Sequence, residues 1–155
     1  MVSFVEPRSF DARSDVQHLP GVMDVEMVRS VPARLVNGGR TRTLAITGLP
    51  PRPRLSRVVT RSGEPVTLSP DGLVMSQMLG GILGVKAGDV VRVEVLEGER
   101  PIRDVPVAAL VDDTLGLQAY MDINALHRLM REGRVLTGAA LTIDPAATDL
   151  SLIHI

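Results

Sequence analysis

An alternation of apolar and charged residues marks one segment of the chain as a half-buried strand. Within residues 90–96 the alternating positions are Val91, Val93 and Val95 against Arg92 and Glu94. Side chains of a strand point alternately to its two faces, so the valines should face the core. Glu97-Gly98-Glu99 can reverse the chain, and residues 102–111 should run back antiparallel, with Pro106 indicating a sheet edge or a bulge.

A second hairpin is predicted from its turn. The segments 33–36 and 41–47 flank Asn37-Gly38-Gly39, whose residues tolerate the positive φ angles that tight hairpin turns require. A further strand is expected at residues 22–28. The run 49–54 holds three prolines, which cannot donate ladder hydrogen bonds, and it predicts an irregular loop.

The remaining strands are shorter or weaker. Residues 2–6 predict a strand that Pro7 ends, after which Ser9 should cap a helix reaching His18. Weak strands are expected between Val58 and Leu68, and a last strand from Leu136 to Ile143.

Two short helices have clear capping residues. Ser76 follows a buried strand, Leu73–Met75, and should cap a helix that Gly84 terminates. Asp122 should cap a helix from Ile123 to Glu132, which Gly133 ends. The residues expected to face inward at helical spacing are Met78, Leu79, Ile82 and Leu83 in the first helix and Ile123, Leu126, Leu129 and Met130 in the second.

These elements predict an α+β fold. Strands dominate and tight turns join neighbouring ones, so a mainly antiparallel mixed sheet with short helices packed on it is expected, in one body or in two small lobes. The 155 residues allow a single domain, and 45% apolar residues can supply its core. Aromatic residues make up only 2%, so aliphatic side chains must fill that core. No internal repeat is evident.

Arginine is unevenly distributed along the chain. Eight arginines and no acid lie between Arg29 and Arg61, although the net charge of the chain is −1. Arg40 and Arg42, across a hairpin from Arg34, are expected to share one sheet face and are candidate contacts for a lipid or a protein. The alternative, a solvated face paired with acids from other segments, is favoured. Nucleic acid is not expected as a partner, because the block has no aromatic residue for base stacking.

Residues that could carry chemistry are scarce. There is no cysteine, and the three histidines have no metal-binding spacing. Asp71 and Asp112-Asp113 stand at turns, where aspartate is favoured for local hydrogen bonding. No catalytic residue, metal site or cofactor is therefore predicted. Tyr120 and Met121 remain open between the core and a contact surface for a partner.

Several motifs, read in order, resemble the extracytoplasmic region of FtsX-like ABC-transporter permeases of the MacB type. In the first half they are Phe4-Val-Glu-Pro-Arg8, Leu19-Pro-Gly-Val22, Pro32-x-Arg-Leu35, Gly39-Arg40 and Ile46-x-Gly-Leu49. In the second half they are Asp71-Gly-Leu-Val74, Leu83-Gly-Val-Lys-Ala-Gly-Asp89, Glu97-Gly-x-Arg-Pro101, Val105-Pro-Val107, Gly116-Leu-x-Ala-Tyr-Met121 and Asp122-x-x-Ala-Leu126. The likeness covers about residues 2–145, and residues 146–155 are expected to be a tail outside the domain.

The resemblance implies a role outside the cytoplasm. In that family a non-catalytic domain, inserted after a membrane helix, couples the motion of a separate cytoplasmic ATPase to the export or extraction of a lipid, lipoprotein, peptide or drug, or to a partner protein. The segment would then be a partial domain, tethered by membrane helices of a parent permease. No run in the sequence approaches the ~18 apolar residues of a membrane helix, and no signal peptide is evident.

A rival hypothesis starts from the motif at residues 83–89, which also marks double-psi barrels. It makes residues 73–111 the centre of an enzyme or substrate-binding module. A closed six-stranded barrel with interlocked psi loops would favour that module, whereas an open sheet with helices on one side and a separate lobe would favour the transporter domain. A third possibility, nucleic-acid binding through the arginine block, predicts steeply salt-dependent association.

Overall fold

The computed structural model describes residues 2–9, 18, 22–50, 52–53, 58, 60–112, 116–132 and 135–143. The strands are β1 (Val2–Ser9), β2 (Val22–Asn37), β3 (Arg40–Leu49), β4 (Leu73–Ser76), β5 (Val90–Val95), β6 (Ile102–Val111), β7 (Ala119–Asp122) and β8 (Val135–Ile143). The helices are α2 (Gln77–Leu83) and α3 (Ile123–Met130).

Six of the strands close into a barrel. The sheet order is β1-β8-β2-β3-β7-β4-β6-β5, and β5 returns to pair with β2. The pairs β3–β7 and β4–β6 are parallel, and the other pairs are antiparallel. The α+β class and the mainly antiparallel mixed sheet are confirmed, but the expectation of an open sheet is wrong.

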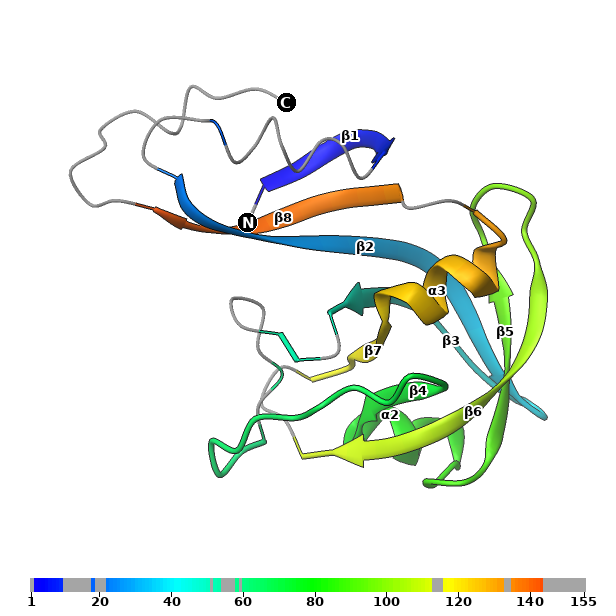
Figure 1. The fold of residues 1–155 in the computed structure, drawn as a ribbon. Coiled ribbons are helices and arrows are strands. Elements are labelled where there is room, and N and C mark those ends of the chain that lie inside the picture. Colours follow the sequence, from blue (N-terminus) through cyan, green and yellow to red (C-terminus); the bar gives the residue numbers. More distant parts are fainter. Residues whose placement is uncertain are drawn as a thin grey trace.

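β2 makes this closure possible because it takes part in two sheets along its length. Its first half, Val22–Val28, pairs with β8; its second half pairs with β3 on one side and with β5 on the other. Figure 1 shows β1, β8 and the start of β2 as a three-stranded layer that extends beyond the barrel. We call these strands the outer layer.

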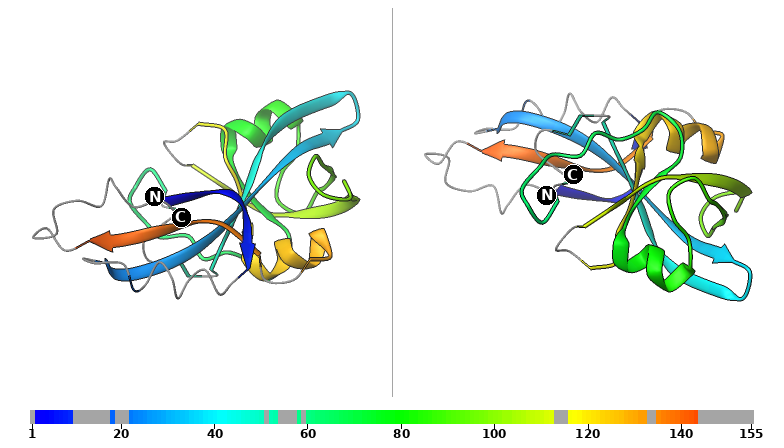
Figure 2. Two further views of the ribbon diagram at one scale, coloured as in Figure 1. Left: turned by 90° about the horizontal axis from the view of Figure 1, so that it is seen from above. Right: turned by 90° about the horizontal axis from the view of Figure 1, so that it is seen from below.

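Aliphatic side chains fill the barrel, as the scarcity of aromatic residues requires. The fully buried residues that line the interior include Val31, Ala33, Leu35, Ile46, Leu73, Met75, Val91 and Val93. α2 and α3 lie on opposite sides of the barrel (Figure 2) and add Leu79, Leu83 and Leu126 to the same core. A second, smaller core lies outside the barrel, where Val58 and Leu68 pack against Val74 and Tyr120.

Both helices begin as predicted. Ser76 caps α2 and accepts a hydrogen bond from the Leu79 N–H, and Gly84 ends the helix in the left-handed conformation. Asp122 caps α3 in the same way. Two details differ: Met78 is 60% exposed rather than facing inward, and α3 ends at Met130, with Arg131 as the left-handed residue.

Three strand predictions need correction. β1 continues through Pro7 to Ser9, so Ser9 does not begin a helix, and residues 10–17 lie outside the described part of the chain. Where residues 58–68 are described they form a turn at Thr60–Glu64 and a bridge at Pro65 instead of strands. Pro106 predicted an edge or a bulge. β6 lies between β4 and β5 rather than at an edge, but β4 pairs with it only from Val107, and the register shifts between Val107 and Ala109, as a bulge near Pro106 would produce.

The barrel contains two similar strand–helix units. Their similarity was not predicted from the sequence. The first is β4–α2 (73–83) and the second is β7–α3 (119–130). Their strands lie side by side, with Val74 opposite Tyr120. β4 runs parallel to β6, and β7 runs parallel to β3.

Candidate functional site: the Arg29 junction

Arg29 stands where β2 passes from the outer layer into the barrel. Val28 is the last residue of β2 paired with β8, and Arg29 is the first paired with β3, opposite Gly48. The Arg29 side chain is only 1% exposed. A single buried arginine therefore marks the boundary between the two parts of the fold.

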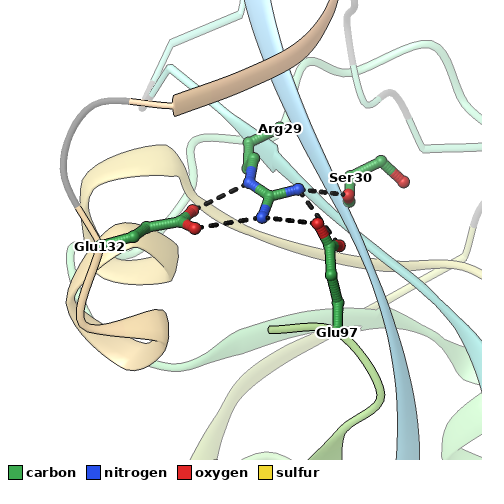
Figure 3. A network of polar contacts seen from close by, with 4 residues as sticks. All are labelled: Arg29, Ser30, Glu97 and Glu132. Atoms are coloured by element: carbon green, nitrogen blue, oxygen red, sulfur yellow. Dashed lines mark hydrogen bonds and ion pairs between the residues drawn. The ribbon is translucent and has the colours of Figure 1, made fainter. Parts of the chain in front are cut away.

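Two glutamates from different elements surround this arginine (Figure 3). The Arg29 Nε donates to Glu132 Oε1 at 2.8 Å, and Nη2 donates to Glu132 Oε2 at 3.1 Å. Nη2 and Nη1 also donate to Glu97 at 3.2 and 3.4 Å. Nη1 donates to the Ser30 carbonyl at 3.0 Å. These five contacts match the five N–H donors of a guanidinium, so every donor of this buried side chain has an acceptor.

The pair of carboxylates keeps Arg29 charged. Burial would lower the pKa of Arg29, but the hydrogen bonds and negative charge of Glu132 and Glu97 outweigh it and raise the pKa. Glu97 and Glu132 are 29% and 19% exposed, so water still reaches them. Loss of one partner of a buried ion pair typically costs about 3–5 kcal/mol, because the remaining charge stays desolvated.

The junction joins three segments that are distant in sequence. Glu97 belongs to the connection between β5 and β6, and Glu132 lies just after α3, close in sequence to β8. Gly48, opposite Arg29, leaves room for α3 to approach β3: a Cβ there would lie 2.7 Å from Leu126 Cδ2 and 3.2 Å from the Arg29 carbonyl. Arg29 of β2 is therefore in contact both with the end of α3 and with the β5–β6 connection.

The candidate contact arginines do not share one face. In the β2–β3 register Arg34 stands opposite Thr43, whereas Arg42 stands opposite the core residue Leu35 and Arg40 opposite Asn37. Paired residues point to the same side of a sheet, so Arg34 lies on the face opposite that of Arg40 and Arg42. The expectation that the three arginines share one face is wrong, because the sequence alone did not give the register of β2 against β3.

Each of these arginines has its own surroundings. Arg34 Nε donates to Glu94 at 2.8 Å, and this contact lowers the pKa of Glu94. Arg40 lies over Gly84 and donates to the Gly81 carbonyl at 3.4 Å. Arg42 is exposed. The predicted pairing of the arginine block with acids from other segments is confirmed at Arg29, Arg34 and Arg61, whose Nε lies 3.5 Å from Asp112.

Tyr120 and Met121 are core residues. Both are buried, Tyr120 in the small outer core and Met121 in the barrel interior.

Groups that could hold a metal ion do not come together in the described ranges. No three histidine, aspartate or glutamate side chains are placed there to hold a metal ion. Asp71 lies 3.5 Å from Arg128 at the surface. In the same ranges no helix combines the length and apolar character needed to span a bilayer.

Sequence interpretation overlooked the Arg29 junction, although one local sign was present. Val31, Ala33 and Leu35 all face the core, and counting back by two places Arg29 on the same face. An arginine at an inward position of an apolar strand requires acidic partners. Which acids supply them depends on contacts 68 and 103 residues away.

Comparison with known proteins bears on the fold. No family model and no curated protein matches the sequence. Among solved structures, the chain is similar to the extracellular domain of the noncanonic ABC-type transporter YknZ from Gram-positive bacteria, with a TM-score of 0.61 and 12% identity over 90% of this chain and 75% of that one. It is also similar to the periplasmic region of MacB from Actinobacillus actinomycetemcomitans, with a TM-score of 0.54 and 12% identity over 97% and 70% of the two chains.

These matches extend over nearly the whole chain, so the barrel is part of the likeness. A closed barrel was expected to favour an enzyme module, but it does not separate the two hypotheses, because transporter domains match this fold. The resemblance to MacB-type domains is confirmed at the level of the fold. The chain has the fold of the extracytoplasmic domains of ABC transporters of the YknZ and MacB kind.

Proposed function

We propose that the chain is an extracytoplasmic domain of an ABC-transporter permease and that it transmits motion without catalysing a reaction. The observation that carries the proposal is the fold likeness to two transporter domains over at least 90% of the chain. Membrane helices of the parent permease would tether the domain, and a cognate ATPase on the cytoplasmic side would drive it. Its load would be a lipid, lipoprotein, peptide or drug, or a partner protein.

The Arg29 junction supplies a physical route for such motion. β2 is shared by the outer layer and the barrel, and Arg29 ties it to the end of α3 and to the β5–β6 connection. A buried, fully hydrogen-bonded charge has few alternative geometries at low energy. The outer layer should therefore move together with α3 rather than independently of it, as rigid-body transmission requires.

An enzyme or substrate-binding module centred on residues 73–111 is the second candidate, and the closed barrel is compatible with it. The described residues line shallow cavities of about 270 and 400 Å³. No histidine lines either cavity, and the acids present are Asp71 and Asp104. An enzyme would require a pair of groups with matched acid and base roles, and both aspartates are exposed, without the burial that sets such roles apart.

Single cysteines test the location, because these 155 residues contain none, and any cysteine elsewhere in the gene product is first replaced by serine. Thr41→Cys places a thiol at an exposed position of β3, and Ala33→Cys places one at a fully buried position of the same hairpin. Each variant is made in the full-length gene product in its own host. A membrane-impermeant maleimide added to intact cells should label Thr41→Cys and spare Ala33→Cys. Labelling of Thr41→Cys only after lysis would exclude the extracytoplasmic location.

A further inference from the structure

The first half of β6 has one edge without a neighbouring strand. β5 pairs with residues 102–106 on one side. On the other side β4 begins to pair only at Val107. A strand edge of this kind presents backbone groups that can accept a further strand.

The direction of the backbone groups can be read from the bonds around them. The Val107 N–H donates to the Asp89 carbonyl at 2.7 Å, and the Val107 carbonyl accepts from Gly88 at 2.9 Å. The Pro101 carbonyl likewise accepts from Val95. Backbone groups of alternate residues point to the same side, so those of Ile102 and Asp104 point away from β5.

These outward groups lack strand partners within the described part of the chain. The Ile102 carbonyl accepts only from the side chain of its neighbour, with Arg103 Nη1 at 3.0 Å. β6 therefore offers two N–H and two C=O groups along this edge. The half-buried Arg103 side chain that occupies one of them can be displaced.

A groove of about 270 Å³ runs beside this edge. Its floor is apolar and consists of the buried residues Met121, Ala125 and Leu129. The charged residues that also line it are Asp71, Arg103, Asp104 and Arg128. We call this feature the β6 edge groove.

One arginine of the groove has no ion-pair partner among the residues that the structure describes. Arg128 has Asp71 at 3.5 Å, whereas Arg103 is half-buried and has no carboxylate within 4 Å among the residues that the structure places. The neighbouring Asp104 stands opposite Arg92 in the ladder, with its side chain on the other face of β6. A carboxylate brought to Arg103 would give this guanidinium an ion-pair partner.

We propose that the β6 edge groove binds an extended segment of a partner protein, which adds a strand to β6 and brings a carboxylate to Arg103. The backbone groups of Ile102 and Asp104 supply the hydrogen bonds, and the apolar floor receives alternate side chains of the segment. Strand addition of this kind combines main-chain hydrogen bonds for affinity with side-chain contacts for specificity. The site does not depend on the transporter function proposed above.

Labelled hexapeptides test the proposal on the 155-residue chain. The probe alternates valine and glutamate, and a counterpart alternates valine and lysine. The glutamate peptide should bind measurably by fluorescence anisotropy at low salt, and the lysine peptide should bind at least about tenfold more weakly, since charge complementarity selects the partner. Equal binding of both peptides, or of neither, overturns the proposal.

N-methylation separates strand addition from binding by charge alone. Two further glutamate peptides carry N-methyl groups on alternate residues, one set on each edge of the extended peptide. Only one edge can face β6, so one peptide should lose binding and the other should retain it. If both bind equally, a simple contact between carboxylate and arginine explains the affinity and the proposal fails.

Variants of the chain locate the site. Arg103→Gln should weaken binding of the glutamate peptide about tenfold, the value of one charged hydrogen bond. Arg92→Gln is the matched control, because it changes an arginine on the other face of the same hairpin and should leave binding unchanged. Weakening by Arg92→Gln alone would place the peptide elsewhere and overturn the proposal. Circular dichroism verifies that both variants are folded.

Discussion

The two strand–helix units of the barrel use the same local design. Each begins with a four-residue buried strand with methionine at its third position, Met75 or Met121. Each continues with a capping residue, Ser76 or Asp122, whose side chain accepts the N–H of the third helical residue. One short strand followed by one capped helix thus recurs on the two sides of the barrel.

The units differ in how each helix approaches a long strand. In the first, Gly80 on α2 faces Leu110 on β6: a Cβ at Gly80 would lie 2.9 Å from the Leu110 methyl carbons. In the second, Leu126 on α3 faces Gly48 on β3, at 2.7 Å from a Cβ at Gly48. Gly80 and Leu126 are both the fourth residue of their helix.

The glycine lies on the helix in the first unit and on the long strand in the second, and this difference explains why no repeat is visible in the sequence. Each contact needs one large and one small residue, but either element can supply the large one. The helix carries the small residue in the first unit and the large residue in the second, so aligned positions of the two units hold unlike residues. The backbone similarity survives while the sequence similarity is reduced to the methionine and the cap.

The ends of the two helices are also held differently. The Leu83 carbonyl at the end of α2 accepts from Asn37 Nδ2 at 2.7 Å, a neutral hydrogen bond. Just after α3, Glu132 forms an ion pair with the buried Arg29. An ion pair thus connects the second unit to Arg29, at the boundary of the outer layer. A neutral hydrogen bond connects the first unit to the tip of the β2–β3 hairpin.

Loss of Glu132 should have the largest effect. Glu132→Ala leaves Arg29 buried with one carboxylate fewer and should lower the free energy of unfolding by about 3 kcal/mol. Asn37→Ala, the matched change at α2, removes one neutral hydrogen bond and should cost about 1 kcal/mol. Urea unfolding followed by circular dichroism measures both. Equal costs would show that the Arg29 network adds nothing beyond an ordinary hydrogen bond.

A combined variant separates the charge from the packing. Arg29→Met with Glu132→Leu removes both charges and should recover most of the stability lost in Glu132→Ala, because apolar residues can replace a buried ion pair. Its expected defect is in coupling the outer layer to α3 rather than in stability.

Adding a methyl group at Gly48 and at Gly80 tests how closely each helix packs against its long strand. Gly48→Ala should cost about 2 kcal/mol, because backbone atoms of Arg29 and Ile123 also lie within 3.3 Å of the added Cβ. Gly80→Ala should cost less, about 1 kcal/mol or below: the Val85 carbonyl lies 3.3 Å from the added Cβ, but the nearest atoms are leucine methyls that can move, and alanine favours the helix. Thermal melts of both variants check the order, and a larger loss in Gly80→Ala would contradict it.

Removing the two caps should have similar, smaller effects. Ser76 Oγ accepts from Leu79 and Gln118, and Asp122 Oδ1 accepts from Asn124 and Ala125. Ser76→Ala and Asp122→Ala should each cost about 1 kcal/mol. Asp122→Ser makes the second unit like the first and should retain most of the stability. If it is as damaging as Asp122→Ala, the carboxylate has a role beyond capping.

A change outside both units should have the smallest effect and depend on pH. The pKa of Glu94 is lowered from 4.5, chiefly by its hydrogen bond with Arg34. A lowered carboxyl pKa adds stability that is complete above the unfolded pKa and is lost as pH falls through the folded pKa. Glu94→Gln should therefore flatten the loss of stability on acidification below about pH 4.5. An unchanged acid limb would show that the exposed Arg34 pair contributes nothing measurable.

Local physics made much of the fold predictable. The hairpin at Asn37-Gly38-Gly39, the valine alternation in β5, the two capping residues and the final strand all depend on residues close together in sequence. Turn geometry, strand periodicity and N-cap hydrogen bonds act over a few residues, so the sequence contains the necessary information.

Tertiary structure alone decided how these elements meet. Closure of the barrel requires β2 to pair with β5, whose partner residues lie about 60 positions away. The β2–β3 register set the opposite faces of Arg34 and Arg42. Hydrogen bonds from two distant segments enclosed Arg29 between Glu97 and Glu132, and the pairing of β4 with β6 only from Val107 left the start of β6 without a second neighbour. Register between distant strands is fixed by burial of whole faces rather than by any local motif, and for that reason neither the junction nor the groove could be read from the chain.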